Sequence, residues 1–282
     1  MQIDVTDSDD GSIRAAIQAV LGEHNEQALG QSQGRHAIAV LLRGADGSLH
    51  GGAWGAISFR WLSFELAFLP EAHRGRGMGR AMLQALEHAA AVRGAIGVRT
   101  ASFQAPGFFL RQGYTEYARL ADFPPGHDDV GLYRRLDSLS ADPGLDVLHA
   151  PDPDLREQLR HLQATHDATL SNHTEQHPLS VVVRNAEGCV LGGMTGHTAH
   201  DWLQVSLVAL PPSLRGVGAG TRILTAAHDA ARARGVRGAR LSTGSHQARP
   251  FYEKLGYATY GAIPDYQPGG IDRFLMAKRF DR

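Results

Sequence analysis

Two short stretches combine arginine with alternating glycines, a pattern suited to binding phosphate. They read Arg74-Gly75-Arg76-Gly77-Met78-Gly79 and Arg215-Gly216-Val217-Gly218-Ala219-Gly220. Each follows an apolar run that predicts a strand, and each precedes an alanine- and leucine-rich run that predicts a helix. The first N–H groups of a helix have no intrahelical partner, and glycine lets a ligand approach the backbone. Both stretches therefore predict a cradle for a pyrophosphate, with Arg74, Arg76, Arg80 and Arg215 adding positive charge.

Two other phosphate-binding motifs do not fit these stretches. The dinucleotide fingerprint Gly-x-Gly-x-x-Gly fails because Arg80 occupies its last position when counting starts at Gly75. The triphosphate loop needs Gly-Lys-Ser/Thr, which neither stretch contains. A glycine-rich turn with solubilising arginines is the alternative for one stretch alone. The motif occurs twice, each time between a predicted strand and a predicted helix, and this weighs against that alternative.

The glycine stretches belong to a longer internal repeat. Trp61 and Trp202, which head the two apolar runs, are 141 residues apart, and so are Arg74 and Arg215. A repeat of this length is a whole domain, because solenoid repeats span only about 20–50 residues. The chain of 282 residues thus predicts two domains, at 1–137 and 145–282, joined by a polar linker at 138–144.

Each half shows the same order of predicted elements, β-α-β-β-β-α-β-α-β-β. Antiparallel hairpins come first and a strand–loop–helix crossover follows, so we expect an α/β fold in which helices flank a mixed, mostly antiparallel sheet. In the first half, residues 13, 17, 20 and 21 place apolar side chains on one helical face. The single cysteine, Cys189, is expected to be a small buried hydrophobe in a strand, and it cannot form an internal disulfide.

Composition limits the class of protein. The formal net charge is −1, which gives no indication of a nucleic-acid or anionic-membrane surface. No apolar run approaches the roughly 20 residues of a membrane helix, and no signal peptide is recognisable, so a cytoplasmic protein is expected. The scattered histidines show no metal-binding spacing, and we expect no metal site. The sequence does not indicate an oligomeric state.

The chain resembles the GNAT superfamily of acyl-CoA-dependent N-acyltransferases. The resemblance rests on the two glycine stretches and on residues 248–257, which are similar to that family's Ala-x-x-Phe-Tyr-x-x-x-Gly-Tyr/Phe segment. It covers nearly the whole chain as two tandem GNAT-like domains. It implies acetyl-CoA as the cofactor, with its pyrophosphate in the glycine loop, and a backbone N–H at Leu207 or Val208 that polarises the thioester carbonyl. The implied cofactor-binding residues are Leu207, Val208, Arg215, Gly216, Val217, Gly218, Ala219, Gly220, Thr221 and Ser245, and in the first half Arg74, Gly75, Arg76, Gly77, Met78, Gly79 and Arg80.

The two halves differ at the residues that could move protons. The resemblance implies that Tyr252 protonates the departing thiolate, and the matching residue in the first half is Phe109, which has no proton to donate. Conversely, Glu65 of the first half matches Ser206 of the second, and both are candidate catalytic residues together with Tyr252. Glu65 could deprotonate an ammonium group, be paired, or point to solvent. His246 could be a base in the second half or an ordinary loop histidine. Family members often carry asparagine where this chain has Ser245 and Ser102.

These observations predict an N-acetyltransferase whose second half carries the main activity. Its acceptor would be a primary amine of a small molecule or peptide, bound by the first helix and by variable segments such as 165–177 and 123–129. The first half could bind coenzyme A weakly, regulate the enzyme or be structural. The alternatives are a non-catalytic acetyl-CoA sensor and an acetyltransferase that modifies proteins.

Overall fold

The computed structural model describes residues 2–7, 11–29, 34–137, 142–169, 175–267 and 269–280, with the side chains of 166–169 excepted. The chain divides into two compact units. Unit 1 holds Met1–Gln33, Ala118–Asp129 and Thr174–Arg282, and unit 2 holds Gly34–Tyr117 and Val130–His173. Residues 138–141 of the expected linker and 170–174 of the expected acceptor segment lie outside the described residues.

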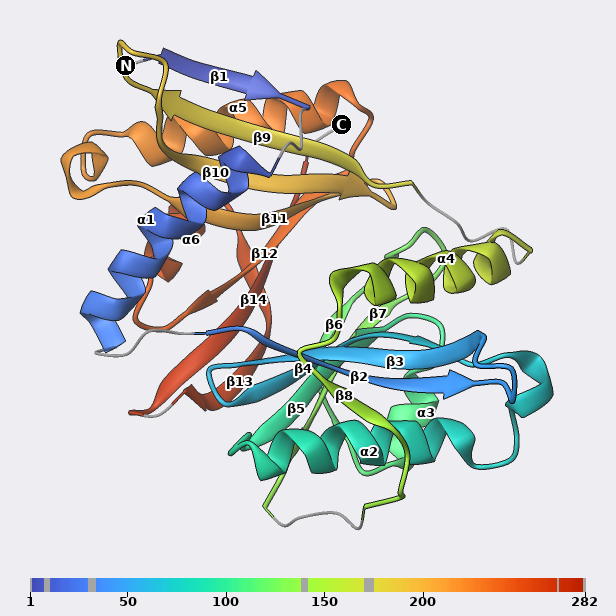
Figure 1. The fold of residues 1–282 in the computed structure, drawn as a ribbon. Coiled ribbons are helices and arrows are strands. Elements are labelled where there is room, and N and C mark those ends of the chain that lie inside the picture. The colour runs from blue at the N-terminus through green and yellow to red at the C-terminus, as the bar shows by residue number, and fades with distance from the viewer. Residues whose placement is uncertain are drawn as a thin grey trace. The chain divides into compact units, whose positions relative to one another are not determined.

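Unit 1 is built on a seven-stranded mixed sheet in the order β1-β9-β10-β11-β12-β14-β13 (Figure 1). Among the described strands of this unit, only β11 and β12 pair in parallel, because the α5 crossover joins them, and the other pairs are antiparallel. Its elements are β1 (Gln2–Thr6), α1 (Ser12–Leu29), β9 (His177–Arg184), β10 (Val190–Ala199), β11 (Trp202–Ala209), the 3₁₀ turn η2 (Pro212–Leu214), α5 (Ala219–Ala233), β12 (Gly238–Gly244), α6 (Arg249–Lys254), β13 (Ala258–Gln267) and β14 (Ile271–Arg279).

Unit 2 repeats this design, with the strand order β7-β5-β4-β3-β2-β8. Here β4 and β5 form the parallel pair, joined through α2. Its elements are β2 (His36–Arg43), β3 (Leu49–Ser58), β4 (Trp61–Phe68), η1 (Glu71–His73), α2 (Met78–Val92), β5 (Gly97–Ser102), α3 (Pro106–Arg111), β7 (Asp129–Arg135), β8 (Val147–His149) and α4 (Pro153–Thr169). The strand β6 (Thr115–Leu120) lies across the boundary of the two units in the sequence.

The mixed α/β fold and the order of elements in each half are confirmed. The expectation for Cys189 is wrong, because this residue is exposed and lies in the turn before β10. Its backbone N–H donates to Asn185 Oδ1 at 2.8 Å, and this side-chain bond holds the turn around Glu187-Gly188. The hairpin turn therefore extends one residue further than the apolar pattern indicated.

The first strand and helix of each sequence half pack on the other half's sheet. Strand β1 pairs with β9, and α1 lies against β10 and β11, all in unit 1. Strand β8 pairs with β2, and α4 lies against β3 and β4, all in unit 2. The units thus differ from a simple division at 138–144. Both sheets offer an apolar face to such a helix, so the sequence pattern alone does not choose between them.

In each unit, the side chains that alternate along one strand pack against two different helices, one on each face of the sheet. In β9 of unit 1, Val181 and Val183 pack with α5, whereas Val182 packs with Ile13 and Ile17 of α1. In β2 of unit 2, residues 38 and 40 pack with α2, and residues 39 and 41 pack with Leu159 of α4. Because successive strand residues point to opposite faces, each sheet has a helix on either side, as Figure 1 shows.

Candidate active site

The two glycine loops have the same backbone conformation. Gly216 and Gly218 have φ angles of 74° and 79°, and their counterparts Gly75 and Gly77 have 74° and 81°. Positive φ costs little only for glycine, which explains the alternate spacing. The loop arginine stabilises this turn from within, since Arg215 Nε donates to the Leu210 carbonyl at 2.8 Å. Arg74 does the same to Leu69 at 2.9 Å.

The loop of unit 1 leads directly into the N-terminus of α5. The first helical bond runs from the Arg222 N–H to the Gly218 carbonyl, so the N–H groups just before it are available to an anion. Apart from the adjoining residues, no atom of the described part of the chain lies within 4 Å of where a Cβ on Gly216 or Gly218 would stand, so the backbone is open there. At Gly220 a Cβ would come within 3.1 Å of the Phe251 ring. The donor set and open backbone fit the pyrophosphate of coenzyme A.

A β-bulge lies at Ser206 in β11. Thr195 of β10 faces Leu207, but the next residue, Gly196, faces Val205, so Ser206 is left without a partner in the ladder. Unit 2 has the same bulge, where Trp54 faces Leu66 and Gly55 faces Phe64. The extra residue there is Glu65, the sequence counterpart of Ser206. A bulge re-aims the backbone that follows it, which in unit 1 is Leu207-Val208.

Strands β11 and β12 separate immediately before this bulge. They pair over only three residues, ending at Gln204 and Arg240, although each strand continues for several residues more. The parallel pair of unit 2 ends in the same way at Ser63 and Arg99. Two strands that diverge expose backbone groups on their facing edges, and these can bind a ligand. The sequence contains no direct mark of this separation.

A cavity of about 700 Å³ occupies the gap in unit 1. A volume of this size is typical of a small-molecule or cofactor site. It is lined by the bulged part of β11, the glycine loop, the end of β12, α6 and one face of α1. The lining residues include Leu21, His24, Ser206, Leu207, Val208, Arg215, Gly216, Gly218, Gly220, Thr221, Thr243, His246, Gln247 and Tyr252.

Tyr252 lies in the wall of this cavity and is 9% exposed. It stands on α6 with its ring 5.2 Å from that of Phe251 and 6.0 Å from that of Tyr257. Burial raises the pKa of the Tyr252 phenol to about 12, because an apolar wall disfavours the phenolate. The phenol therefore keeps its proton at neutral pH, as a proton donor must.

Three of the cofactor residues predicted in the second half do not line the cavity, and the predicted residues at 74–80 belong to unit 2 and do not line it either. Val217 is 66% exposed at the loop tip, and Ala219 is buried beneath the start of α5. The hydroxyl of Ser245 accepts a hydrogen bond from the Asp272 N–H at 3.1 Å and so ties the loop after β12 to β14. The backbone of residues 217 and 219 belongs to the same turn as the lining glycines, so these residues shape the cradle without facing it.

Helix α1 supplies site residues that the sequence did not identify. His24 lines the cavity, and its Nδ1 lies 3.2 Å from an Nη of Arg215. Asn25 is buried and accepts a hydrogen bond from Gln247 Nε2 at 3.2 Å. Gln247 Oε1 in turn accepts from the Gly244 N–H at 2.9 Å. The helix thus holds the loop between β12 and α6. The helical periodicity around Leu21 was visible in the sequence, but its contact with the second half was not.

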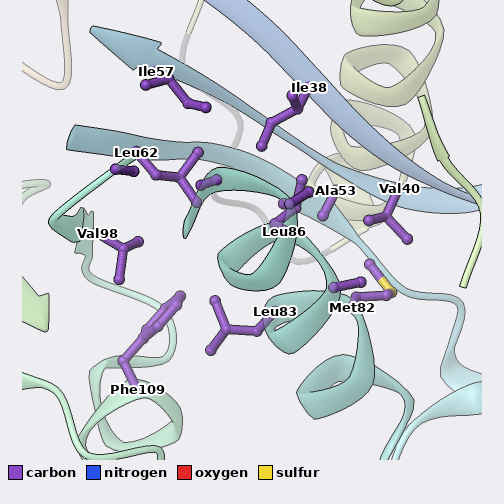
Figure 2. Close-up of a cluster of buried hydrophobic side chains, with 14 of the residues drawn as sticks. Ile38, Val40, Ala53, Ile57, Leu62, Met82, Leu83, Leu86, Val98 and Phe109 are labelled. Carbon is purple, nitrogen blue, oxygen red and sulfur yellow. The ribbon is translucent and has the colours of Figure 1, made fainter. Parts of the chain in front are cut away.

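The matching gap in unit 2 is bridged and filled. Thr100 Oγ1 donates to the Phe64 carbonyl at 3.1 Å and connects β5 to β4 beyond their paired residues. The Phe64 and Phe109 rings meet edge to face at 5.7 Å. Figure 2 shows Phe109 pointing into the buried cluster that contains Leu83 and Val98. In unit 1 the residue at the same register is Leu241, which has no hydroxyl, and the nearby Thr243 Oγ1 donates to Gln247 Oε1.

Glu65 is paired with two arginines. Its Oε1 lies 2.5 Å from Arg35, and its Oε2 lies 3.3 Å from Arg156 on α4. It belongs to unit 2 and does not line the cavity that holds Tyr252 and Ser206. Of the three sequence interpretations, pairing is the one the structure shows. Of the expected catalytic residues, the structure therefore brings Tyr252 and Ser206 to one cavity but not Glu65.

Comparison with known proteins identifies the family. The model of the acetyltransferase (GNAT) family matches residues 145–257. Acetyltransferase Atu2258 from Agrobacterium fabrum is 30% identical over 129 residues, which cover 46% of this chain and 93% of that protein. Blasticidin-S acetyltransferase from Streptomyces morookaense is 37% identical over 106 residues, covering 36% of this chain and 78% of that protein. An acetyltransferase structure from Bacillus cereus aligns with 27% identity and a TM-score of 0.42, covering 46% of this chain and 94% of its own.

The chain belongs to the GNAT acetyltransferase family. The two curated relatives each match less than half of the chain but most of their own length. None of the described helices combines the length and apolarity needed to cross a membrane.

Proposed function

We propose that this protein transfers an acetyl group from acetyl-CoA to a primary amine, and that the chemistry takes place in unit 1. The observation that carries the proposal is the single cavity lined by the glycine loop, the bulged strand and Tyr252. A cofactor cradle, backbone donors and a protonated phenol facing one space match the requirements of acyl transfer.

The glycine loop and the N-terminus of α5 would hold the pyrophosphate of coenzyme A. The N–H groups before Arg222 would donate to the phosphate oxygens, with the helix dipole and Arg215 adding positive charge. When bound, acetyl-CoA supplies the activated acetyl group. The gap between β11 and β12 would orient it along the exposed edge of β11.

Two groups of the chain would act on the reacting atoms. The backbone N–H at Leu207 or Val208, aimed by the bulge at Ser206, would donate to the acetyl oxygen and stabilise the negative charge that develops there. Tyr252 would give its phenol proton to the leaving sulfur. Desolvation around Tyr252 keeps that proton on the oxygen until negative charge appears nearby.

The acceptor would be the amine of a small molecule or peptide. Blasticidin S is the first compound to assay, because one relative is named for its acetylation. The closed gap of unit 2 supports assigning a structural or regulatory role to that unit. A non-catalytic acetyl-CoA sensor and a protein-modifying acetyltransferase are the competing functions.

Calorimetric titration with acetyl-CoA tests the proposal. We expect one site per chain, with binding lost in Gly218→Val, because a β-branched residue cannot easily adopt the positive φ of the loop. The matched variant Gly77→Val changes the same position of unit 2 and should leave that site within about threefold of wild type. No binding by the wild-type protein would overturn the proposal, and loss in Gly77→Val alone would move the site to unit 2.

Release of free thiol from acetyl-CoA separates the enzyme from the sensor. With blasticidin S and a set of simple primary amines, the enzyme should release thiol in proportion to acetylated product. Binding of acetyl-CoA with no product from any amine or peptide tested would support the sensor. Product from peptides alone would support the protein-modifying alternative.

A further inference from the structure

His246 stands in the cavity wall with no partner for its ring. Both ring nitrogens are shielded from solvent, and neither has a hydrogen-bond partner among the described residues. The residue lines the same cavity as Tyr252 and Ser206. A buried polar group without a partner costs stability, and contact with a ligand or a role in a reaction would account for it. The sequence left open whether His246 is a base or a loop residue, and this position favours the base.

The neighbouring glycine determines where the His246 ring lies. A Cβ on Gly244 would stand 2.7 Å from both Cε1 and Nδ1 of that ring, so any larger residue would displace it. The strand registers match Ser102 with Thr243, and the loops match Gln104 with Gln247, so the second half has two more residues in this interval, which holds Gly244 and His246. The half that lacks the tyrosine therefore lacks the placed histidine as well.

The charged groups around His246 favour its uncharged form. Burial lowers its pKa, and the charge of His24, which lines the cavity from α1, lowers the pKa further. The pKa of His24 is lowered by burial and then by the Arg215 guanidinium. On β14, Asp272 uses its Oδ1 to accept from the Asp265 N–H. The residues that line the cavity include no aspartate or glutamate, so no carboxylate among them competes for the proton.

We propose that His246 is the base that takes a proton from the acceptor amine. This rests on the proposed acetyl transfer. The acceptor enters as R–NH₃⁺, the His246 ring turns so that one nitrogen faces it, and that nitrogen removes one proton and frees the lone pair of the amine. The pair forms the new N–C bond to the acetyl carbon, and the C–S bond breaks with its electrons on sulfur. Tyr252 protonates the sulfur, a second nitrogen proton returns to the Tyr252 oxygen, and the proton on His246 passes to solvent.

The variant His246→Gln distinguishes a base from a structural residue when two probe amines are compared. Ethylamine is protonated near neutral pH and needs a base, whereas hydroxylamine is uncharged and does not. We expect turnover with ethylamine to fall about 100-fold and turnover with hydroxylamine to stay within about threefold. Acetyl-CoA affinity measured by calorimetry should also stay within about threefold. His149→Gln, at an exposed position on β8, is the control and should change neither rate.

Equal losses with both amines, or no loss with ethylamine, would overturn the inference. Failure of the wild-type protein to bind acetyl-CoA would instead overturn the proposed function. NMR titration of the histidine rings with coenzyme A bound needs no turnover. The pKa of His246 should lie below the ordinary 6.5 and rise in His24→Gln. A pKa at or above 6.5 that is unchanged in His24→Gln would overturn the role of His24 and the uncharged base together.

Discussion

At the scale of single residues, the two halves of the chain differ where protons would move. Tyr252 lies in an open cavity, whereas its counterpart Phe109 fills a core with Phe64. His246 folds over Gly244 in a loop that is two residues longer than its counterpart in the first half. Glu65 shows the opposite case in the first half: its carboxylate suggested a base, but it forms ion pairs with Arg35 and Arg156. Side-chain type suggested chemistry at each place, and local packing decided which side chains could perform it.

The substitution Tyr252→Phe tests the proton donor. It removes one hydroxyl from a buried ring, so we expect kcat to fall about 100-fold or more while the affinity for acetyl-CoA stays within about threefold. Steady-state kinetics with calorimetry measures both. Tyr257→Phe is the matched control, because that buried hydroxyl bonds to His228 and should affect stability more than kcat. Unchanged kcat in Tyr252→Phe would assign the proton transfer to another group.

At the scale of elements, both units use the same three devices. A glycine loop enters a helix, a bulge redirects one strand, and the two parallel strands pair over three residues before they separate. A buried hydrogen bond also recurs, with different chemistry, between the helix after the glycine loop (α2 or α5) and the tyrosine just before the strand that follows the short helix (β6 or β13). In unit 2, Glu87 accepts from Tyr114 and Arg134, both at 2.7 Å. In unit 1, His228 Nε2 lies 2.8 Å from the Tyr257 hydroxyl.

The contact at Gly220 tests the fit between α5 and α6. Gly220→Leu would push a side chain toward Phe251, which lies 3.1 Å from the position of a Cβ there. We expect a loss of about 1–3 kcal/mol in the free energy of unfolding and a displaced α6, with weaker acetyl-CoA binding. Gly79→Leu is the control, because its Cβ would lie 3.7 Å from Phe108, an ordinary contact. Chemical denaturation of both variants measures the difference, and equal losses would contradict this account.

His228 makes the stability of unit 1 depend on pH. Burial, followed by the charges of Lys278 and Arg232, lowers its pKa to about 4 from 6.5. The unfolded chain therefore binds this proton more tightly than the folded protein. Its contribution is complete above pH 6.5 and declines as the pH falls toward 4, by about 3 kcal/mol in total. Denaturation at several pH values should show this decline in wild type and a smaller one in His228→Gln. Equal declines in the wild-type protein and His228→Gln would contradict the assignment of this pH dependence to His228.

At the scale of the whole molecule, the first strand and helix of each half belong to the other half's unit. Strand β1 and α1 complete the sheet and the site of unit 1, and β8 and α4 do the same for the sheet of unit 2. Ile17 of α1 is fully buried against Val182 of β9 and its neighbours. His24 and Asn25 of the same helix reach the cavity and its loop. The family-matched region at 145–257 is therefore not the complete site by itself.

Removal of residues 1–33 should damage unit 1 selectively. The truncated protein would expose the edge of β9 and the apolar surface under Ile13 and Ile17, and would lack one wall of the cavity. We expect loss of acetyl-CoA binding together with faster hydrogen exchange in β9 and β10, while β2 and β3 of unit 2 exchange as before. The milder Ile17→Ala should cost about 2–5 kcal/mol of unit 1 stability. Uniform exchange changes in both units would contradict the assignment of α1.

The sequence by itself determined the two-fold repeat, the order of elements, the glycine loops and the candidate proton donor. These follow from local rules, since hydrophobic periodicity, turn residues and positive-φ glycines act within a few residues of one another. Only the tertiary structure decided which sheet α1 joins, that Glu65 is paired, and that His24 and His246 share the cavity with Tyr252. Such contacts join residues that are 30 to 222 positions apart in the sequence. An amphipathic helix that fits two similar apolar faces carries no local mark of which one it will cover.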